Sequence, residues 1–168
     1  HLGGAKALNA LTNTWELIPK CLIFVAGFIC KSASSHNEHR NQFANCIGSI
    51  LGSTGKTFWG VYSYIRSYRP RLFVLENVLG LRGINLAEVV RLLQEADHHV
   101  KVYTLCSTEY WLPQKRWRLW ILGIDKIWAD SYGCSSAFFE STLDHFINLL
   151  QFPGEAVPLS DVLLPETN

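Results

Sequence analysis

An apolar run that ends in a polar loop constrains the fold of this chain more than any other feature. Residues 21–28 read CLIFVAGF, and the polar stretch that follows carries Cys30. A short, continuous apolar run predicts a strand that is buried on both faces, as parallel strands flanked by helices are. Such a strand would deliver the thiol of Cys30 to one edge of a sheet.

The rest of the chain alternates between helical and strand patterns. Apolar residues at helical spacing predict helices over residues 57–68, 86–96 and 137–150. Short apolar runs predict further strands over residues 71–76, 100–106 and 119–124. The loop of residues 107–118 is too short for a crossover helix, so the last two strands are expected to be antiparallel neighbours. This order of elements predicts an α/β fold with a mainly parallel sheet.

Two local patterns lead to finer expectations. Asn85 and Glu88 have the spacing of a capping box, so the helix over residues 86–96 is expected to begin directly after Asn85. Leu8, Leu11 and Trp15 also lie at helical spacing near the start of the chain, in a segment that Pro19 ends.

The composition indicates a packed domain with no strong bias of charge. The chain has 168 residues, of which 48% are hydrophobic and 17% charged, with a net charge of +1. This length can bury a core, and the small net charge leaves any nucleic-acid binding to local patches. The five cysteines are scattered, which favours a reducing compartment over a disulfide framework. The first residue is His1 and the sequence contains no Met, so we interpret the chain as a piece of a longer protein.

The polar residues are expected to converge on one edge of the sheet. Cys30 follows the first predicted strand, Glu76 ends the second, and Gln114, Arg116 and Arg118 lie in the loop after the third. In an open α/β sheet, ligands bind at the carboxyl ends of the strands. Each residue alone also fits an ordinary role, as a small core cysteine, a loop cap or a surface charge. Their shared edge favours a functional site.

Two other patterns resemble ligand sites. Residues 52–57, GSTGKT, are similar to a phosphate-binding loop, but Ile50 stands where that loop requires Gly. A set of four residues could suggest zinc, namely Cys30, His36, His39 and Cys46. Their spacings fit no common pair of zinc ligands, and a metal would quench the thiol. We therefore expect neither nucleotide nor metal at these positions.

Three segments, in order, resemble the DNA cytosine-5 methyltransferase family. Residues 27–31 (GFICK), with Ser34 following, resemble its Gly-Phe-Pro-Cys-Gln…Ser loop. Residues 69–81 are similar to its Arg-Pro…Glu-Asn-Val…Gly-Leu segment. Residues 110–123 contain its Pro-Gln-x-Arg-x-Arg motif and the strand after it. Together with a similar stretch near the C-terminus, the resemblance covers about residues 17–165.

The resemblance implies a Rossmann-like, S-adenosylmethionine-dependent methyltransferase fold with an antiparallel last strand. Residues 1–168 would then form part of a catalytic domain, from the nucleophile loop through the Pro-Gln-x-Arg-x-Arg motif. The glycine-rich turn that binds the methyl donor and the target-recognition region of the family are absent from this sequence. We therefore expect the 168-residue chain to be inactive alone.

The resemblance also implies roles for the residues at the predicted edge. Cys30 matches the family's nucleophile, which adds to C6 of cytosine and makes C5 nucleophilic. Glu76 matches the carboxyl group that binds the cytosine edge and assists at N3. Arg116 and Arg118 match arginines that orient the base and the active-site loop, and Arg118 reaches the cytosine carbonyl. Gln114 matches the glutamine of the motif and is given a supporting role in nucleic-acid binding.

Further positions are implied for the methyl donor and for phosphate. Gly27, Ile29 and Thr57 align with positions that contact S-adenosylmethionine. Ser34 falls where a phosphate-contacting serine lies. Ile29 stands in place of the family's Pro, and Lys31 in place of its Gln. A cation at Lys31 could lower the pKa of the thiol or contact a phosphate.

The function implied is methyl transfer from S-adenosylmethionine to C5 of cytosine in DNA. Methylation of tRNA cytosine uses much the same motifs and remains an alternative. A degenerate homologue that binds DNA without catalysis is another, and a non-enzymatic interaction domain is a third. DNA, or RNA, is the expected partner, and the longest apolar run is far below the roughly 20 residues of a membrane span. No targeting signal is visible, so a nuclear location is expected for a eukaryotic protein and a cytoplasmic one otherwise.

Overall fold

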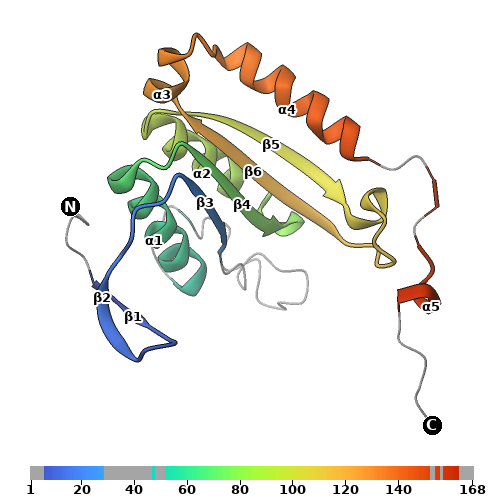
Figure 1. Ribbon diagram of the computed structural model, residues 1–168, viewed down its shortest axis with the longest axis horizontal. Coiled ribbons are helices and arrows are strands. Elements are labelled where there is room, and N and C mark those ends of the chain that lie inside the picture. Colours follow the sequence, from blue (N-terminus) through green and yellow to red (C-terminus); the bar gives the residue numbers. More distant parts are fainter. Residues whose placement is uncertain (1–5, 29–46, 48–51, 152–153, 156, 163–168) are drawn as a thin grey trace.

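The computed structural model describes residues 6–28, 47, 52–151, 154–155 and 157–162. Its centre is a four-stranded sheet in the order β3-β4-β6-β5 (Figure 1). The strands are β3 (Ile23–Gly27), β4 (Leu72–Val78), β5 (His98–Cys106) and β6 (Trp117–Asp125). β3 and β4 are parallel, and β6 is antiparallel to both β4 and β5.

The expectation of a mainly parallel sheet therefore needs correction. Within this four-stranded sheet, one pairing is parallel and the other two are antiparallel, because β6 lies between β4 and β5. The antiparallel pairing of the last two strands agrees with the prediction. β5 still runs in the direction of β4, so both strands end at the same edge of the sheet.

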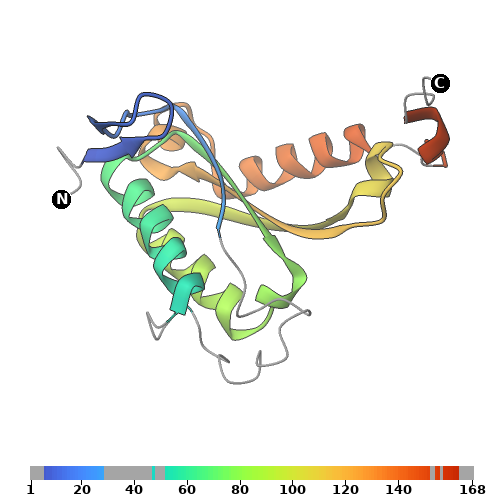
Figure 2. The ribbon, with the colours of Figure 1, turned by 90° about the horizontal axis from the view of Figure 1, so that it is seen from below.

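Helices cover the two faces of the sheet. α1 (Gly52–Tyr68) and α2 (Ile84–Glu95) lie together on one face, and α4 (Ser136–Leu150) crosses the other (Figure 2). The short α3 (Lys126–Ser131) follows β6, and α5 (Leu159–Val162) lies near the C-terminus. Within the described residues, no helix is both long enough and apolar enough to cross a membrane.

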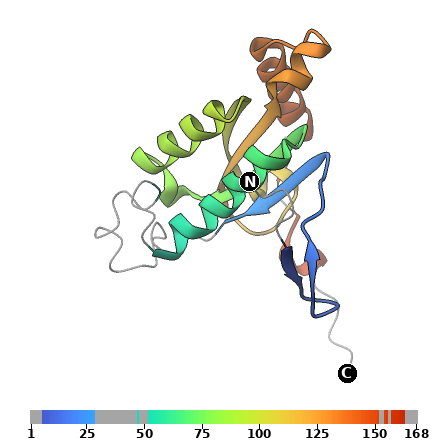
Figure 3. The same ribbon diagram turned by 90° about the vertical axis from the view of Figure 1, so that its left-hand side faces the viewer.

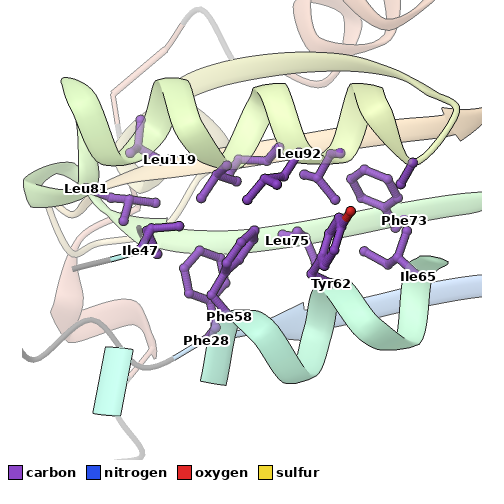
Figure 4. Packing of buried hydrophobic residues seen from close by; sticks show 14 residues of the cluster. Phe28, Ile47, Phe58, Tyr62, Ile65, Phe73, Leu75, Leu81, Leu92 and Leu119 are labelled. Atoms are coloured by element: carbon purple, nitrogen blue, oxygen red, sulfur yellow. The ribbon is translucent and has the colours of Figure 1, made fainter. Parts of the chain in front are cut away.

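The main core lies between the sheet and the pair α1 and α2. Alternate residues of the strands point into it, such as Phe73 and Leu75 of β4 and Ile121 of β6, as the two-residue period of a strand requires (Figure 4). They pack against Phe58 of α1 and Leu93 of α2, and all five are at most 1% exposed. The residues between them, which include Val74 and Glu76, point to the opposite face.

β3 is buried on one face only, contrary to the prediction for residues 21–28. Phe24 and Ala26 pack against the core, but Ile23 and Val25 are 58% and 69% exposed. β3 is one of the two edge strands of the described sheet, and no described element covers its outer face. An apolar run indicates that the face of a strand can be buried, whereas its actual burial requires another element that packs on it.

The start of α2 also differs from the prediction. The helix begins at Ile84, and Gly83 takes the N-cap position with φ +80°, which glycine adopts without strain. Asn85 lies inside the helix, and its Oδ1 accepts a hydrogen bond from the backbone N–H of Ile47 at 3.3 Å. The Asn85–Glu88 capping box is therefore wrong, because the Asn85 side chain binds a distant segment.

The N-terminal segment forms a hairpin, although three of its apolar residues have helical spacing. β1 (Lys6–Asn9) pairs antiparallel with β2 (Thr14–Leu17), apart from the main sheet (Figure 3). Leu8, Leu11 and Trp15 are all more than half exposed, so their spacing does not reflect a buried helical face.

Two glycines differ sharply in the space around them and provide a test of the core. A Cβ built on Gly123 of β6 would lie 2.1 Å from Cζ of the buried Phe73 ring, whereas one on Gly60 of α1 meets nothing within 4 Å. We expect Gly123→Ala to destabilise the protein by about 1–3 kcal/mol through overpacking. Gly60→Ala is expected to stabilise it by about 0.5–1 kcal/mol. Urea denaturation followed by tryptophan fluorescence checks both, and equal effects would contradict this packing.

A buried histidine lies at the start of β5. His98 is 0% exposed, its Nδ1 lies 2.8 Å from the carbonyl oxygen of Ala96, and its ring packs against Phe73. Burial lowers the pKa of His98 below its ordinary value, although the Ala96 carbonyl and Asp125 act in the opposite direction. The folded protein therefore holds this imidazole neutral.

The buried imidazole predicts a loss of stability in mild acid. The unfolded chain takes up this proton near pH 6.5, so the stabilisation is complete above about pH 6.5 and decreases as the pH falls through the lower folded-state pKa. In His98→Asn, the amide can still donate to the Ala96 carbonyl, but the titration is gone. We expect its unfolding free energy to fall less steeply between about pH 6.5 and 5 than that of the unsubstituted protein. Parallel pH curves from urea denaturation would contradict the role of His98.

Candidate active site

A hollow of about 560 Å³ lies on the face of the sheet that carries Glu76. Its floor is formed by alternate residues of β4 and β6, including Val74 and Trp120. The connection between β5 and β6 forms one wall, and Ile147 and Leu150 at the end of α4 form another. The hollow therefore opens where β4 and β5 end, which is where ligands bind in open α/β sheets.

The charged floor of the hollow is an ion pair across two strands. Glu76 Oε1 and Arg118 Nε lie 2.8 Å apart, with side chains 34% and 23% exposed. Glu76 is opposite Trp120 in the antiparallel register, and Val78 is opposite Arg118, so the two charges are diagonal neighbours on one face. β4 continues to Val78, so Glu76 lies inside the strand and not at its end as predicted.

The end of β3 lies directly beside this carboxylate. Gly27 is opposite Glu76 in the parallel register, and a Cβ on Gly27 would lie 3.5 Å from Glu76 Oε2. The next residue, Phe28, is 5% exposed, and its carbonyl accepts a hydrogen bond from Asn77 Nδ2 at 3.2 Å. The chain therefore leaves β3 next to Glu76, two residues before Cys30.

Arg116 contributes a second guanidinium to the lining of the hollow. It lies in the connection between β5 and β6, together with Gln114, which is exposed and is not among the lining residues. Burial raises the pKa of the Tyr110 phenol, which also lines the hollow, so this group is neutral at physiological pH. The charged residues that line the hollow are thus one carboxylate and two guanidiniums, Glu76, Arg116 and Arg118.

The structure brings together only some of the residues that the sequence singles out. Glu76, Arg116 and Arg118 share the hollow, and Gly27 lies beside it. Thr57 is on α1, which packs on the opposite face of the sheet. Four predicted residues lie outside the described part of the chain: Cys30, Ile29, Lys31 and Ser34.

Several lining residues were not identified from the sequence. Ser107 and Tyr110 belong to a 3-10 turn, Ser107–Tyr110, within the segment that the sequence predicts only as a loop. Ile147 and Leu150 fit the helical pattern of residues 137–150, but nothing in that pattern shows which sheet face the helix meets. The position of Ser107, a polar residue directly after a strand, is the one sequence signal that could have identified a lining residue.

The described part of the chain includes only one of the two alternative ligand sites. Residues 52–57 lie in the first turns of α1. Cys30, His36, His39 and Cys46 lie outside the described residues. Among the residues that the structure describes, no group of three or more His, Cys, Asp or Glu is placed to hold a metal ion.

The sequence matches the family model for C-5 cytosine-specific DNA methylases over residues 7–148. Similar proteins include the Type II methyltransferase M.HpaII of Haemophilus parainfluenzae, which is 30% identical over 152 residues that cover 86% of this chain and 39% of the relative. The Type II methyltransferase M.Sau3AI of Staphylococcus aureus is 28% identical over 146 residues, covering 83% of this chain and 33% of the relative. This chain thus spans about a third of the length of these relatives.

A solved structure, that of the Entamoeba histolytica methyltransferase EhMeth, overlaps with 62% of this chain and 32% of its own, with a TM-score of 0.49 and 16% sequence identity.

Proposed function

Because the chain belongs to the C-5 cytosine-specific DNA methylase family, we propose that it forms part of the catalytic domain of an enzyme that methylates cytosine in DNA. The observation that carries this proposal is the shared hollow of Glu76, Arg116 and Arg118 beside the end of β3. A cytosine ring presents an amine, a ring nitrogen and a carbonyl oxygen along one edge. One carboxylate and two guanidiniums complement these groups.

Cys30 is the proposed nucleophile. Its thiolate adds to C6 of cytosine, and the ring electrons then make C5 nucleophilic enough to attack an electrophilic methyl group. Loss of the proton from the methylated C5 breaks the Cys–C6 bond and returns the thiolate. What supports Cys30 is its distance along the chain from Phe28, whose carbonyl is fixed by Asn77 next to Glu76.

Glu76 and the two arginines bind and polarise the base in this proposal. Glu76 binds the amine edge and assists at N3 as the thiolate adds to C6. Arg118 reaches the cytosine carbonyl, and Arg116 orients the base from the wall of the hollow. The low water access of the ion pair, with Arg118 only 23% exposed, strengthens its interaction with a bound base.

The methyl donor in this proposal is S-adenosylmethionine, which supplies an electrophilic methyl group on a sulfonium. Gly27 and Thr57 are the described residues proposed to contact it, together with Ile29. Among the described residues, a Cβ on Gly27 would approach only Glu76 Oε2, so glycine leaves the space beside the end of β3 open. Ser34, Lys31 and Gln114 are proposed to contact the nucleic acid, from which the target base must be flipped out.

A covalent trap tests the nucleophile and the substrate together. The full-length protein that carries this chain is incubated with S-adenosylmethionine and duplex DNA containing 5-fluorocytosine, whose C5 cannot lose a proton. We expect a covalent protein–DNA adduct that Cys30→Ser abolishes. Cys106→Ser is the matched control, because Cys106 lines the hollow but is 2% exposed and lies against Thr108 Oγ1.

Each outcome of the trap decides between the candidate functions. An adduct that survives Cys30→Ser and is lost in Cys106→Ser would move the nucleophile to β5. An adduct on RNA but not on DNA would change the substrate to tRNA-like cytosine. No adduct on either nucleic acid would favour a homologue that binds DNA without catalysis.

A further inference from the structure

Ser107 organises the connection between β5 and β6 to an unusual degree. Its hydroxyl donates a hydrogen bond to the carbonyl oxygen of Gln114 and accepts one from the backbone N–H of Arg116 at 3.0 Å. Its own backbone N–H donates to the carbonyl oxygen of Arg116 at 3.1 Å. The side chain and the backbone of one residue therefore hold both sides of the segment that carries Gln114 and Arg116.

The carbonyl of Ser107 holds the other part of the same connection. It accepts hydrogen bonds from the N–H of Trp111 and from that of Leu112, the latter at 3.3 Å. Trp111 has φ +69°, a left-handed conformation that a bulky residue keeps only when its surroundings fix it. The path of the chain from β5 to β6 is thus fixed by hydrogen bonds that meet at Ser107.

We propose that Ser107 is a positioning residue that sets where Arg116 lies in the hollow. Ser107 is outside the segment that resembles the family motif, which begins at Tyr110. The hydroxyl hydrogen-bonds a carbonyl and an N–H that the two strands leave unpaired at the turn, which an apolar side chain cannot do. The hydroxyl fixes the backbone of Arg116 itself. Its loss is therefore expected to change the position of the Arg116 guanidinium directly.

This inference rests on the proposed function, because the role of Arg116 is to orient a base. Its test compares three variants of the full-length protein in steady-state methyl transfer to DNA: Ser107→Ala, Ser107→Thr and Thr108→Ala. Ser107→Ala removes the hydroxyl, and Ser107→Thr restores it. Thr108→Ala is a matched control, since its hydroxyl belongs to the same 3-10 turn but lies 3.1 Å from Cys106 Sγ, away from the segment that carries Gln114 and Arg116.

We expect Ser107→Ala to lower kcat about tenfold to a hundredfold with a smaller change in KM, because the loss is one of orientation, while Ser107→Thr and Thr108→Ala stay within about threefold. Hydrogen–deuterium exchange is measured on the same proteins. The amide of Arg116 is expected to exchange faster in Ser107→Ala and to be protected again in Ser107→Thr. The thermal midpoint is recorded for each variant.

Three outcomes are distinguishable. Unchanged protection of the Arg116 amide in Ser107→Ala overturns the proposal. A lower thermal midpoint with kcat unchanged also overturns it, because Ser107 then serves stability alone. If the unsubstituted protein transfers no methyl group, the proposed function fails by itself, and the exchange of the Arg116 amide still decides whether Ser107 holds the connection.

Discussion

Replacing Glu76 by glutamine is expected to lower kcat/KM for methyl transfer by about a hundredfold or more, within the range for a group that assists proton transfer. Glutamine keeps the size of the side chain and can still contact the amine of a cytosine. It removes the negative charge that now lies 2.8 Å from Arg118, and with it the group that assists at N3. Steady-state kinetics of the full-length protein on DNA measure the loss.

Glu88→Gln is the matched control for this substitution. Glu88 is also a glutamate paired with an arginine, since its Oε1 lies 2.7 Å from Nη2 of Arg91, but it belongs to the surface of α2. We expect Glu88→Gln to leave kcat/KM unchanged. A Glu76→Gln protein with undiminished activity would show that the carboxylate has no part in the reaction, and the hollow would lose its proposed role.

The sequence predicts best those helices and strands whose apolar residues all face the same core. The strand over residues 71–76 and the helix over residues 57–68 both appear, as Leu72–Val78 and Gly52–Tyr68. Their apolar residues face the core between the sheet and α1. The shared edge of Glu76, Arg116 and Arg118 follows from the same reasoning, because the directions of β4 and β5 fix it.

The errors occur where a residue's surroundings come from a distant part of the chain. Asn85 has the sequence context of a helix cap, but Ile47, far away along the chain, takes its side chain as a partner. Val25 has the sequence context of a buried strand, but it is 69% exposed because no element of the described chain packs on that face of β3. The periodicity of apolar residues indicates which structures a segment can form, and tertiary contacts determine which of them it adopts.

The second large effect is expected far from the hollow, at Asp125. This residue ends β6, is 4% exposed, and lies 2.8 Å from both Nε and Nη2 of Arg69 through its Oδ2. Its other oxygen, Oδ1, accepts the N–H of Trp128 and caps α3. Arg69 has φ +47° and directly follows α1, and its N–H donates to the carbonyl oxygen of Ile65. One carboxylate therefore joins the end of α1, the end of β6 and the start of α3.

Asp125→Asn is expected to destabilise the protein by about 2–3 kcal/mol. The amide oxygen can still cap α3, so the loss reports the charge alone. This value lies at or below the lower end for a broken buried pair, because the Arg69 side chain is 34% exposed and keeps some contact with water. Urea denaturation near neutral pH, followed by tryptophan fluorescence, measures the difference.

Asp97 offers a control with the same arginine. Its Oδ2 lies 3.2 Å from Nη1 of Arg69, but its side chain is 61% exposed. Asp97 has φ +61°, which asparagine tolerates as well as aspartate does, so Asp97→Asn adds no backbone strain. We expect it to cost less than about 1 kcal/mol, as exposed pairs do. Since both substitutions remove one negative charge beside Arg69, equal losses would show that burial of Asp125 does not govern the strength of its pair.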